Sequence, residues 1–590
     1  MRRAPVERAA FKSPCSGPSV SCMSTNDSKT RGATKPVGEK SIWLGSDDSP
    51  VFARLTTPIT ESALGGLLVS PPIGREARAA RTALRTLSLN MASEGFSVLR
   101  IDHFGTSDSS GDLDDDRFFE KWTEQIGEGV AFLRSLGSVS VSAVGMRLGA
   151  TILGRSAELL DLNLTSVVLW DPCESGRSYL RERATLEALH RPSDTLGASA
   201  DVQNSEFVFR EETKDRLRSL TLLEVEPTRL AERVLIIVRG DRVTSTKLSE
   251  RFDADSVEWA STNEQSALME VELPSATLPN LALTQIRDWI GIPPVAITPL
   301  LPTSHGVGAI VSGNAGPMSV REKSFSVGPK GLFAITSEPV GESNGPWIIF
   351  VNGMNEDHVG PSRLWVDLSR RWSSYGLRCV RFDFNGIGES PRIASNISPR
   401  DIDESNMEDI CDVARGVSPQ DPSNVVLLGL CSGAHQALEA ALKLRARGVC
   451  TINPQVGRSI SQNADRLVKS DRRFVQNVAS RIRREIEKRR WIGQLVWQFS
   501  RFILPSAYAP RVRRRLASHG TDMLLIASPD GLMSFPRVPI LRSLDKRRLI
   551  STASCRIEVV PGMDHDFLNS EGRAKAVAIL DDHIMKTFTS

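Results

Sequence analysis

One cysteine lies between two glycines in the run Asn424–Gln436, NVVLLGLCSGAHQ. The β-branched residues before it predict a strand and the alanine-rich residues after it predict a helix, so Cys431 would occupy a sharp strand-to-helix turn. Such a strained turn needs neighbours without a Cβ atom, which Gly429 and Gly433 provide. The helix N-terminus would favour the thiolate. The pattern indicates a nucleophile, and its alternative is a buried cysteine in a glycine-rich turn.

A nucleophilic thiol also requires a base and an acid that orients the base, and two later residues can provide them. Asp530 follows the apolar run 523–527, and His565 follows the run 557–560 in a Gly-Met-Asp-His-Asp-Phe turn. An imidazole takes the thiol proton, and a carboxylate orients that imidazole. The order predicts a triad of Cys431, Asp530 and His565. For Asp530, the alternative is a surface acid in a turn.

Acyl chemistry also needs two backbone N–H groups that stabilise an oxyanion. We expect one from Ser432 and the other from the first strand-to-helix loop, around Gly353 and Met354. In that loop, Asn352 and His358 either contact substrate or fix the loop, and for His358 the second role is favoured. The sequence contains no metal-ligand spacing, so neither a metal nor a cofactor is expected.

The elements that must position these side chains alternate between strand and helix. Predicted strands cover 347–351, 377–382, 425–428, 449–452, 523–527 and 557–560, with helices at 364–375 and 573–586. This alternation predicts a mostly parallel sheet in an α/β fold.

An earlier part of the chain repeats the pattern. Predicted strands cover 64–70, 96–101, 139–144, 166–170 and 234–238, with helices at 77–93 and 118–136. Asp102 and Asp383 lie 281 positions apart, and Arg147 and Cys431 lie 284 apart. The slowly growing offset indicates an internal duplication.

The earlier copy lacks the catalytic groups. Arg147 replaces the nucleophile, and residues 273–277 contain no histidine where His565 would be expected. Asp241, the counterpart of Asp530, therefore has no imidazole to orient. We interpret this copy as catalytically inactive, with Arg147 pairing with a carboxylate or phosphate ligand or, equally, forming a structural ion pair.

These patterns divide the chain into four parts. Residues 1–40 form a disordered tail with an alternative start at Met23, 41–294 the inactive domain, 295–319 a linker, and 320–590 the active domain. An apolar fraction of 40% and a net charge of +3 are typical of a soluble protein. Eight cysteines without CxxC pairs favour a reducing, cytoplasmic compartment. No apolar run is long enough to span a membrane.

A basic segment at 456–519 is predicted to be a helical cap. Residues 458–519 contain sixteen Lys or Arg and four Asp or Glu, and 481–502 read as an amphipathic helix. Three partners fit this charge: the acidic remainder of the chain, an acyl carrier such as coenzyme A or acyl-carrier protein, and an anionic membrane surface. Docking of the inactive domain on the active one is the simplest. No nucleic-acid-binding module accompanies the basic run.

The active domain resembles the α/β-hydrolase superfamily. It is most similar to the serine-aminopeptidase-like branch, including hydrolases associated with exosortase systems. The resemblance rests on residues 352–353, 359–361, 381–390, the Cys431 turn and the His565 turn, and residues 100–109 and 169–172 carry it in the first copy. It implies two tandem α/β-hydrolase domains. Cysteine in place of serine resembles dienelactone hydrolases and polyhydroxyalkanoate synthases.

Three functions follow from these observations. The leading one is an acyl-transfer enzyme that acts on an ester or thioester through an acyl-Cys431 intermediate, as a hydrolase or an acyltransferase. The second is a non-catalytic binding or scaffolding protein built from two decayed hydrolase domains. The third, from the resemblance alone, is a peptidase for small substrates.

Overall fold

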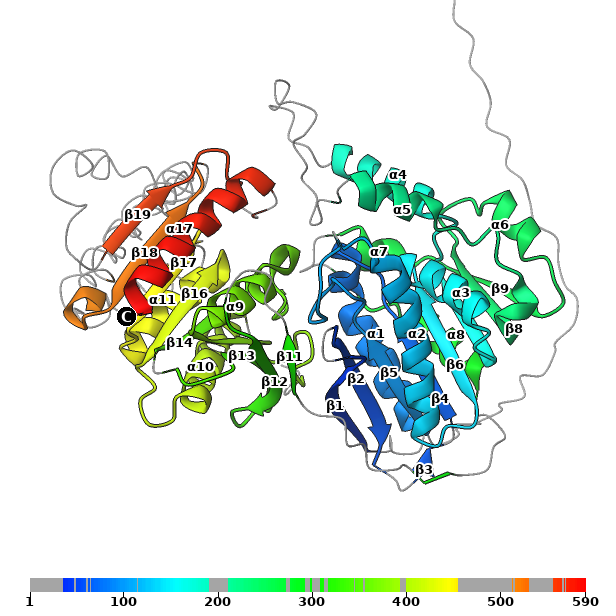
Figure 1. The fold of residues 1–590 in the computed structure, drawn as a ribbon, viewed down its shortest axis with the longest axis horizontal. Coiled ribbons are helices and arrows are strands. Elements are labelled where there is room, and N and C mark those ends of the chain that lie inside the picture. The colour runs from blue at the N-terminus through cyan, green and yellow to red at the C-terminus, as the bar shows by residue number, and fades with distance from the viewer. Residues whose placement is uncertain are drawn as a thin grey trace, which may run out of the picture. The chain divides into compact units, whose positions relative to one another are not determined.

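The computed structural model describes residues 36–589 with gaps, of which the longest are 190–208, 292–297, 300–307, 312–316, 393–398, 455–511 and 530–554. The described residues form two mostly parallel sheets, each flanked by helices (Figure 1). Residues 37–290 are termed the first half and residues 308–588 the second half. A short pairing of β3 (Ser62–Ala63) with β10 (Thr298–Pro299) accompanies them.

The first half contains a sheet of eight strands in the order β1-β2-β5-β4-β6-β7-β8-β9. β1, β2 and β5 pair antiparallel, and the remaining pairs are parallel. Their central members are short apolar runs buried on both faces, as parallel strands covered by helices must be. The strands are β1 (Val37–Leu44), β2 (Val51–Pro58), β4 (Gly65–Ser70), β5 (Phe96–Ile101), β6 (Val141–Met146), β7 (Leu164–Trp170), β8 (Ala231–Arg239) and β9 (Val257–Thr262).

Helices cover both faces of this sheet. α1 (Arg75–Ser93) and α8 (Asn280–Ile290) pack on one face, and α2 (Phe118–Ser135) and α3 (Leu148–Leu160) pack on the other. In α2, Trp122, Ile126 and Val130 recur every four residues, which gives the helix a single buried stripe. The shorter helices are α4 (Gly176–Leu189), α5 (Glu211–Ser219), α6 (Thr246–Arg251) and α7 (Gln265–Met269).

The second half repeats this topology strand for strand. Its sheet has the order β11-β12-β13-β15-β14-β16-β17-β18-β19, which becomes the order of the first sheet once β11 is set aside. This agreement supports the predicted duplication, and the predicted α/β class is confirmed. The strands are β11 (Gly308–Val311), β12 (Val320–Val327), β13 (Leu332–Pro339), β14 (Trp347–Val351), β15 (Arg378–Phe382), β16 (Val425–Leu430), β17 (Gly448–Ile452), β18 (Asp522–Ala527) and β19 (Cys555–Val559).

In the described part of the second half, four helices flank the sheet. α9 (Leu364–Ser374) and α17 (Ser570–Phe588) bury apolar side chains against one face. α10 (Pro399–Val417) and α11 (Ser432–Leu444) do so against the other. Each sheet is therefore the middle layer of three. The carboxyl ends of its parallel strands lie at one edge, which is where α/β sheets bind ligands.

Several predicted boundaries differ from the structure. β1 begins at Val37, inside the predicted tail, and β11 lies inside the predicted linker, where its run Gly-Ala-Ile-Val is short and surrounded by glycine and serine. The antiparallel β1–β2 and β12–β13 pairs were not predicted. β12, VREKSFSV, has four consecutive polar residues and lacks the continuous apolar run used to find the central strands. Most of the predicted basic cap lies outside the described residues.

An aromatic cluster joins the two halves. Trp43 and Phe52 of the first half pack with Phe333 and Ile335 of the second, all four buried. The guanidinium of Arg54 lies 4.9 Å from the centre of the Phe333 ring. β1, β2 and β13 thus contribute side chains to a small core shared by both halves.

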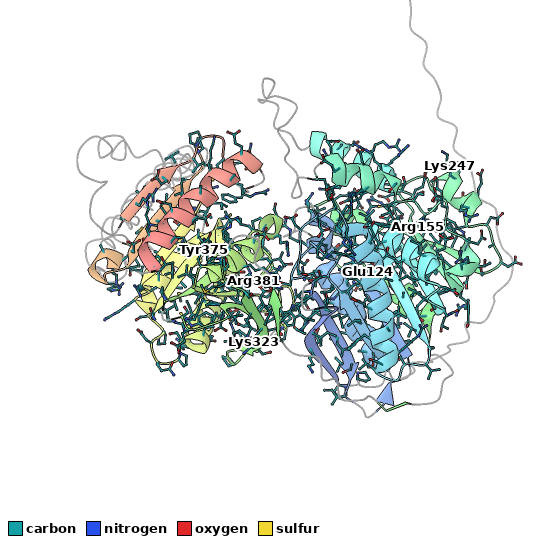
Figure 2. All side chains as sticks on the ribbon, in the orientation of Figure 1. Glu124, Arg155, Lys247, Lys323, Tyr375 and Arg381 are labelled. Carbon is teal, nitrogen blue, oxygen red and sulfur yellow. The ribbon has the colours of Figure 1, made fainter. Side chains whose placement is uncertain are left out.

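Charged residues at equivalent positions surround this cluster. Asp108, in the loop after β5, pairs with Arg381 of β15, which is labelled in Figure 2. Glu389, in the loop after β15, pairs with Arg100 of β5 at 2.6 Å. Asp108 and Glu389 lie 281 positions apart, as do Arg100 and Arg381. The contact is reciprocal, like that between the subunits of a two-fold symmetric dimer.

Truncation of the shared aromatic cluster is expected to destabilise the protein. Phe333 is 5% exposed, so Phe333→Ala should lower the free energy of unfolding by about 3–5 kcal/mol. Leu281→Ala, at a side chain that is 53% exposed, should change it by less than about 0.5 kcal/mol. Thermal unfolding of both variants measures the difference. An unchanged midpoint in Phe333→Ala would mean that the halves separate in solution.

Candidate active site

Cys431 lies at the turn between β16 and α11, near the middle of the second sheet. Its backbone has φ 55° and ψ −119°, a conformation that costs a non-glycine residue roughly 1–3 kcal/mol. Its N–H donates a hydrogen bond to the carbonyl of Ile452 at the end of β17, at 2.9 Å. The side chain is partly exposed. The turn therefore presents a thiol to solvent at the N-terminus of a helix.

The two flanking glycines permit this turn for a steric reason. A Cβ atom on Gly433 would lie 2.2 Å from the carbonyl oxygen of Asn352, at the end of β14. A Cβ atom on Gly429 would lie 2.4 Å from the carbonyl oxygen of Gly433. Both distances are below van der Waals contact with backbone atoms. The prediction that the turn requires neighbours without a Cβ atom is confirmed.

The described oxyanion candidates lie beside Cys431. Ser432 is the first residue of α11, and the N–H groups of a helix's first turn have no carbonyl partner within the helix. Gly353 follows β14, whose end packs against Gly433. Asn352 is buried and donates a side-chain hydrogen bond to the Phe382 carbonyl at 2.7 Å, so it fixes the loop. Met354 lies outside the described residues.

The predicted acid and base, Asp530 and His565, also lie outside the described residues. The strands that precede them, β18 and β19, are adjacent and parallel, so the two following turns begin at the same edge of the sheet as Cys431. The described ends of β16, β18 and β19 therefore lie at one edge of the sheet.

Asn453 is a residue that the sequence analysis did not assign to the site. Its backbone is left-handed, with φ 45°, at the end of β17. Its side-chain oxygen accepts a hydrogen bond from the N–H of Ser528 at 2.7 Å, and its side-chain nitrogen donates to the Asp564 carbonyl at 3.1 Å. It therefore ties the turn that precedes Asp530 to the turn that precedes His565. Asparagine tolerance of left-handed backbone was the only signal available.

His358 lies buried between two carboxylates. Its Nδ1 is 2.8 Å from Asp383 Oδ2, and its Nε2 is 2.6 Å from Oδ2 of Asp108 in the first half. Burial disfavours the imidazolium, but the charges of Asp108 and Asp383 outweigh burial and raise the pKa of His358 to about 10. Burial also acts against the Asp108 carboxylate, yet His358 and Arg381 hold its pKa well below the usual range. His358 fixes its loop and, being fully buried, does not face a substrate.

The first half has the same strand-to-helix turn, but the residue at its apex is not a nucleophile. Arg147 has φ 54° and ψ −125°, nearly the backbone of Cys431, and Gly149 packs on Pro71 as Gly433 packs on Asn352. By this correspondence Pro72 occupies the place of Gly353. Proline has no N–H group, so this position offers no oxyanion donor.

Carboxylates surround the Arg147 side chain. It pairs with Glu182 at 2.6 Å, Glu76 at 3.3 Å and Asp171 at 3.4 Å, and it is buried. Asp241 pairs with Arg239 at 2.7 Å. These contacts support a structural ion-pair role for Arg147, because its guanidinium is already surrounded by anions.

In the described part of the chain, no group of three His, Cys, Asp or Glu residues could hold a metal ion. None of its helices combines the length and the apolar character needed to cross a membrane.

Comparison with known proteins agrees with this geometry. Residues 348–579 match the model of the alpha/beta hydrolase family. The second half is an α/β-hydrolase domain. The match and the fold support a hydrolase-type enzyme. No curated protein matches the chain.

Solved structures that are similar to part of this chain include three hydrolases. A serine hydrolase without lid from Xanthomonas campestris is 16% identical, covers 47% of this chain and 98% of its own, and has a TM-score of 0.28. A proline iminopeptidase from Mycobacterium smegmatis is 15% identical, covers 42% and 97%, and scores 0.31. An esterase from Pyrococcus furiosus is 14% identical, covers 43% and 90%, and scores 0.29.

The charge on His358 predicts a pH dependence of the stability. Its folded pKa, about 10, lies above the ordinary value of 6.5, so its stabilisation is complete below pH 6.5 and is lost as the pH rises through 10. Relative to His358→Gln, the wild type should lose about 1.4 kcal/mol per pH unit between pH 7.5 and 9. Urea unfolding of both proteins across this range tests it, and parallel curves would contradict a charged His358.

Removal of the Arg147 charge should destabilise the first half without affecting the α/β-hydrolase domain's thiol. Arg147→Met leaves three carboxylates without their shared cation, and we expect a loss of about 3–5 kcal/mol. Arg233→Met, at an exposed pair with Glu258, should cost less than about 1 kcal/mol. Thermal unfolding and the rate of Cys431 alkylation are the measurements. Full stability in Arg147→Met would refute the structural role.

Proposed function

We propose that the α/β-hydrolase domain is an acyl-transfer enzyme with Cys431 as nucleophile, His565 as base and Asp530 as the orienting acid. Its substrate is an ester or a thioester. The observation that carries the proposal is the partly exposed cysteine held at a strained turn between a central strand and a helix N-terminus. Such strain persists where a residue must project in one direction, and a thiol there is a nucleophile.

The described cysteines support this assignment by contrast. Cys173, Cys379, Cys411 and Cys450 are buried, and burial raises the pKa of the Cys411 thiol to about 11 and of the Cys379 thiol to about 12. Such thiols stay protonated near neutral pH and react slowly. Cys431 differs in both exposure and backbone.

The reaction follows from these groups. His565 accepts the thiol proton while the Cys431 sulfur attacks the carbonyl carbon, and the negative oxygen is stabilised by the N–H of Ser432 and an N–H near Gly353 and Met354. Collapse of this intermediate breaks the bond to the leaving group, which takes the proton from the imidazolium. Water or another acceptor then attacks the acyl-thioester with His565 as base, and the free thiol is restored. Hydrolysis and transfer share the first half of this sequence.

The basic segment 456–519 suits an acyl group carried on an anionic group such as coenzyme A or acyl-carrier protein. Positive charge on this segment would raise the local concentration of such a substrate. A transfer reaction fits a thiol nucleophile because the thioester intermediate remains reactive toward several acceptors.

The test is mass spectrometry of the intact protein after brief exposure to p-nitrophenyl esters and acyl-thioesters. We expect a single acyl adduct in wild type and in Cys555→Ala, none in Cys431→Ala, and acylation at least about 100-fold slower in His565→Ala. Cys555 is the matched control because it is the other partly exposed described cysteine.

Absence of an adduct across the panel, with Cys431 alkylated no faster than Cys555, would refute the enzyme. The chain would then be a binding protein with two hydrolase-like halves. Acylation of His565→Ala at the wild-type rate would refute the proposed base.

A further inference from the structure

Three consecutive side chains after β14 pair with the catalytically inactive first half. Each contact joins opposite charges. The pairs are Glu356 with Arg78 at 3.1 Å, Asp357 with Arg81 at 2.6 Å, and His358 with Asp108 at 2.6 Å. These three residues are termed the clamped triplet, and they belong to the loop in which the second oxyanion donor is expected.

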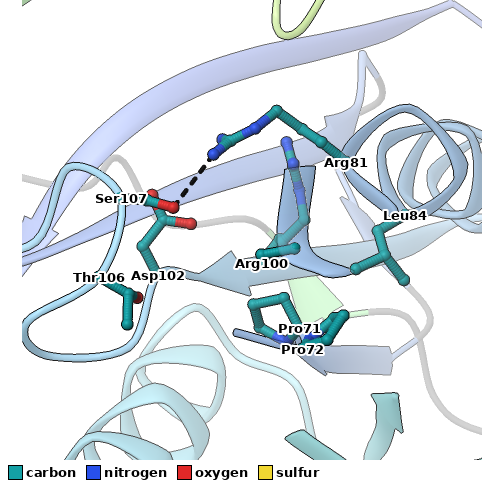
Figure 3. A pocket seen from close by; sticks show the side chains of 9 residues that line it. Pro71, Pro72, Arg81, Leu84, Arg100, Asp102, Thr106 and Ser107 are labelled. Atoms are coloured by element: carbon teal, nitrogen blue, oxygen red, sulfur yellow. Dashed lines mark hydrogen bonds between the residues drawn. The ribbon is translucent and has the colours of Figure 1, made fainter. Parts of the chain in front are cut away.

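Two of the clamping residues come from one helix. Arg78 and Arg81 lie three positions apart on α1 and so face the same side. Arg81 is held within its own half by a hydrogen bond to the Ser107 hydroxyl at 3.1 Å (Figure 3). A cavity of about 10 Å³ beside it has room for about one water molecule. The guanidinium that meets Asp357 is therefore also held by its own half.

The third contact is the most deeply buried. Asp108 and His358 are fully inaccessible, and the His358 backbone N–H also donates to Asp383 at 2.6 Å. A buried charge without a partner costs several kcal/mol, so the side chains have little freedom to separate. His358 is thus fixed through both its ring and its backbone.

The clamped triplet lies close to the catalytic turn along the chain and in space. Gly353 precedes it by three residues, and the Glu356 N–H donates to the Gly353 carbonyl at 3.3 Å. The end of β14 packs directly on Gly433, the second glycine of the Cys431 turn. A shift of the triplet would therefore move the loop N–H groups relative to the sulfur of Cys431. Displacements of about 1 Å reduce catalysis strongly.

We propose that the first half is a built-in positioning domain for the oxyanion hole of the second, acting through Arg78, Arg81 and Asp108. This inference rests on the proposed acyl-transfer function. The three residues touch neither substrate nor Cys431 in this scheme. They act by fixing the loop that supplies the second oxyanion donor.

The contact between the halves is asymmetric in a way that fits this role. Glu389 is the second-half counterpart of Asp108, and it reaches arginines on β2, α1 and β5. None of these is in the 71–74 segment, where the first half has Pro71 and Pro72 in place of a donor loop. In the described chain, therefore, Asp108 reaches the donor loop of the half with a nucleophile, and Glu389 does not reach the corresponding loop.

Two rates measured on Cys431 test the proposal. Acylation by an acyl-thioester builds an oxyanion and needs the hole, whereas alkylation by iodoacetamide displaces iodide and builds no oxyanion. In Arg78→Gln and Asp108→Asn we expect acylation to fall about 10- to 100-fold, less than the effect of deleting a donor outright. Alkylation should stay within about twofold of wild type. A purely structural role would lower both rates or neither.

Two control variants separate the positioning role from a general effect on the contact between the halves. Arg85→Gln alters the same helix and the same contact between halves, because Arg85 donates to the Ser390 carbonyl at 2.8 Å, but Arg85 does not touch the clamped triplet. It should leave acylation unchanged. The exchange of charges in Arg78→Glu with Glu356→Arg should restore acylation that Arg78→Glu alone removes.

The outcomes separate the two proposals. Wild-type acylation in Arg78→Gln, or equal loss of both rates, overturns the positioning role while the proposed enzyme stands. No acylation of the wild type overturns the proposed function, and the positioning role with it. If Asp108→Asn does not fold, Arg78→Gln and the charge exchange decide.

Discussion

A histidine buried between two aspartates links the two halves of the structure. Asp108 belongs to the first half, and His358 and Asp383 belong to the second, and none of the three side chains reaches solvent. Arg381 and Glu322 extend the chain of charges, with Arg381 contacting both Asp108 and Glu322. Separation of the halves would leave Asp108 without His358 and Arg381, whereas His358 would keep Asp383 and Arg381 would keep Glu322. The network therefore ties the halves together through the buried charge of Asp108.

The two halves share one fold but carry different side chains at equivalent positions. Both halves retain the strained turn, with nearly equal dihedral angles at Arg147 and Cys431, because both pack a glycine on the end of the neighbouring strand. The strain is thus a property of the fold. What differs is the side chain at the apex and the donor loop beside it. Arginine with three carboxylates makes an ion-pair cluster in the first half, and a partly exposed cysteine occupies the same place in the second.

Loops of the first half reach the loop beside the Cys431 turn of the second. Here the loop after β5 and helix α1 contact the segment after β14 at three successive residues. Duplication supplies this arrangement directly, because the reciprocal contact of a two-fold dimer gives each copy access to the other's loops. Once both copies lie on one chain, one copy can lose its nucleophile while the contact remains.

The sequence by itself determined the local elements and the apex residue. Continuous apolar runs identified the strands β4 to β8 and β14 to β18, and Gly429 and Gly433 marked the turn at Cys431, because these signals depend only on neighbouring residues. The antiparallel strand β12 was not predicted, because buried and exposed residues alternate along its first four positions.

Only the tertiary structure decided the roles of His358, Asn453 and Asp108. Each is an ordinary polar residue in its own segment, and each acts on a partner far along the chain: Asp108 meets His358 across 250 positions, and Asn453 bridges toward Asp564 across 111. Charge pairing at such distances depends on how two sheets come together. No pattern of neighbouring residues encodes this charge pairing. The burial that strengthens these contacts exists only in the folded chain.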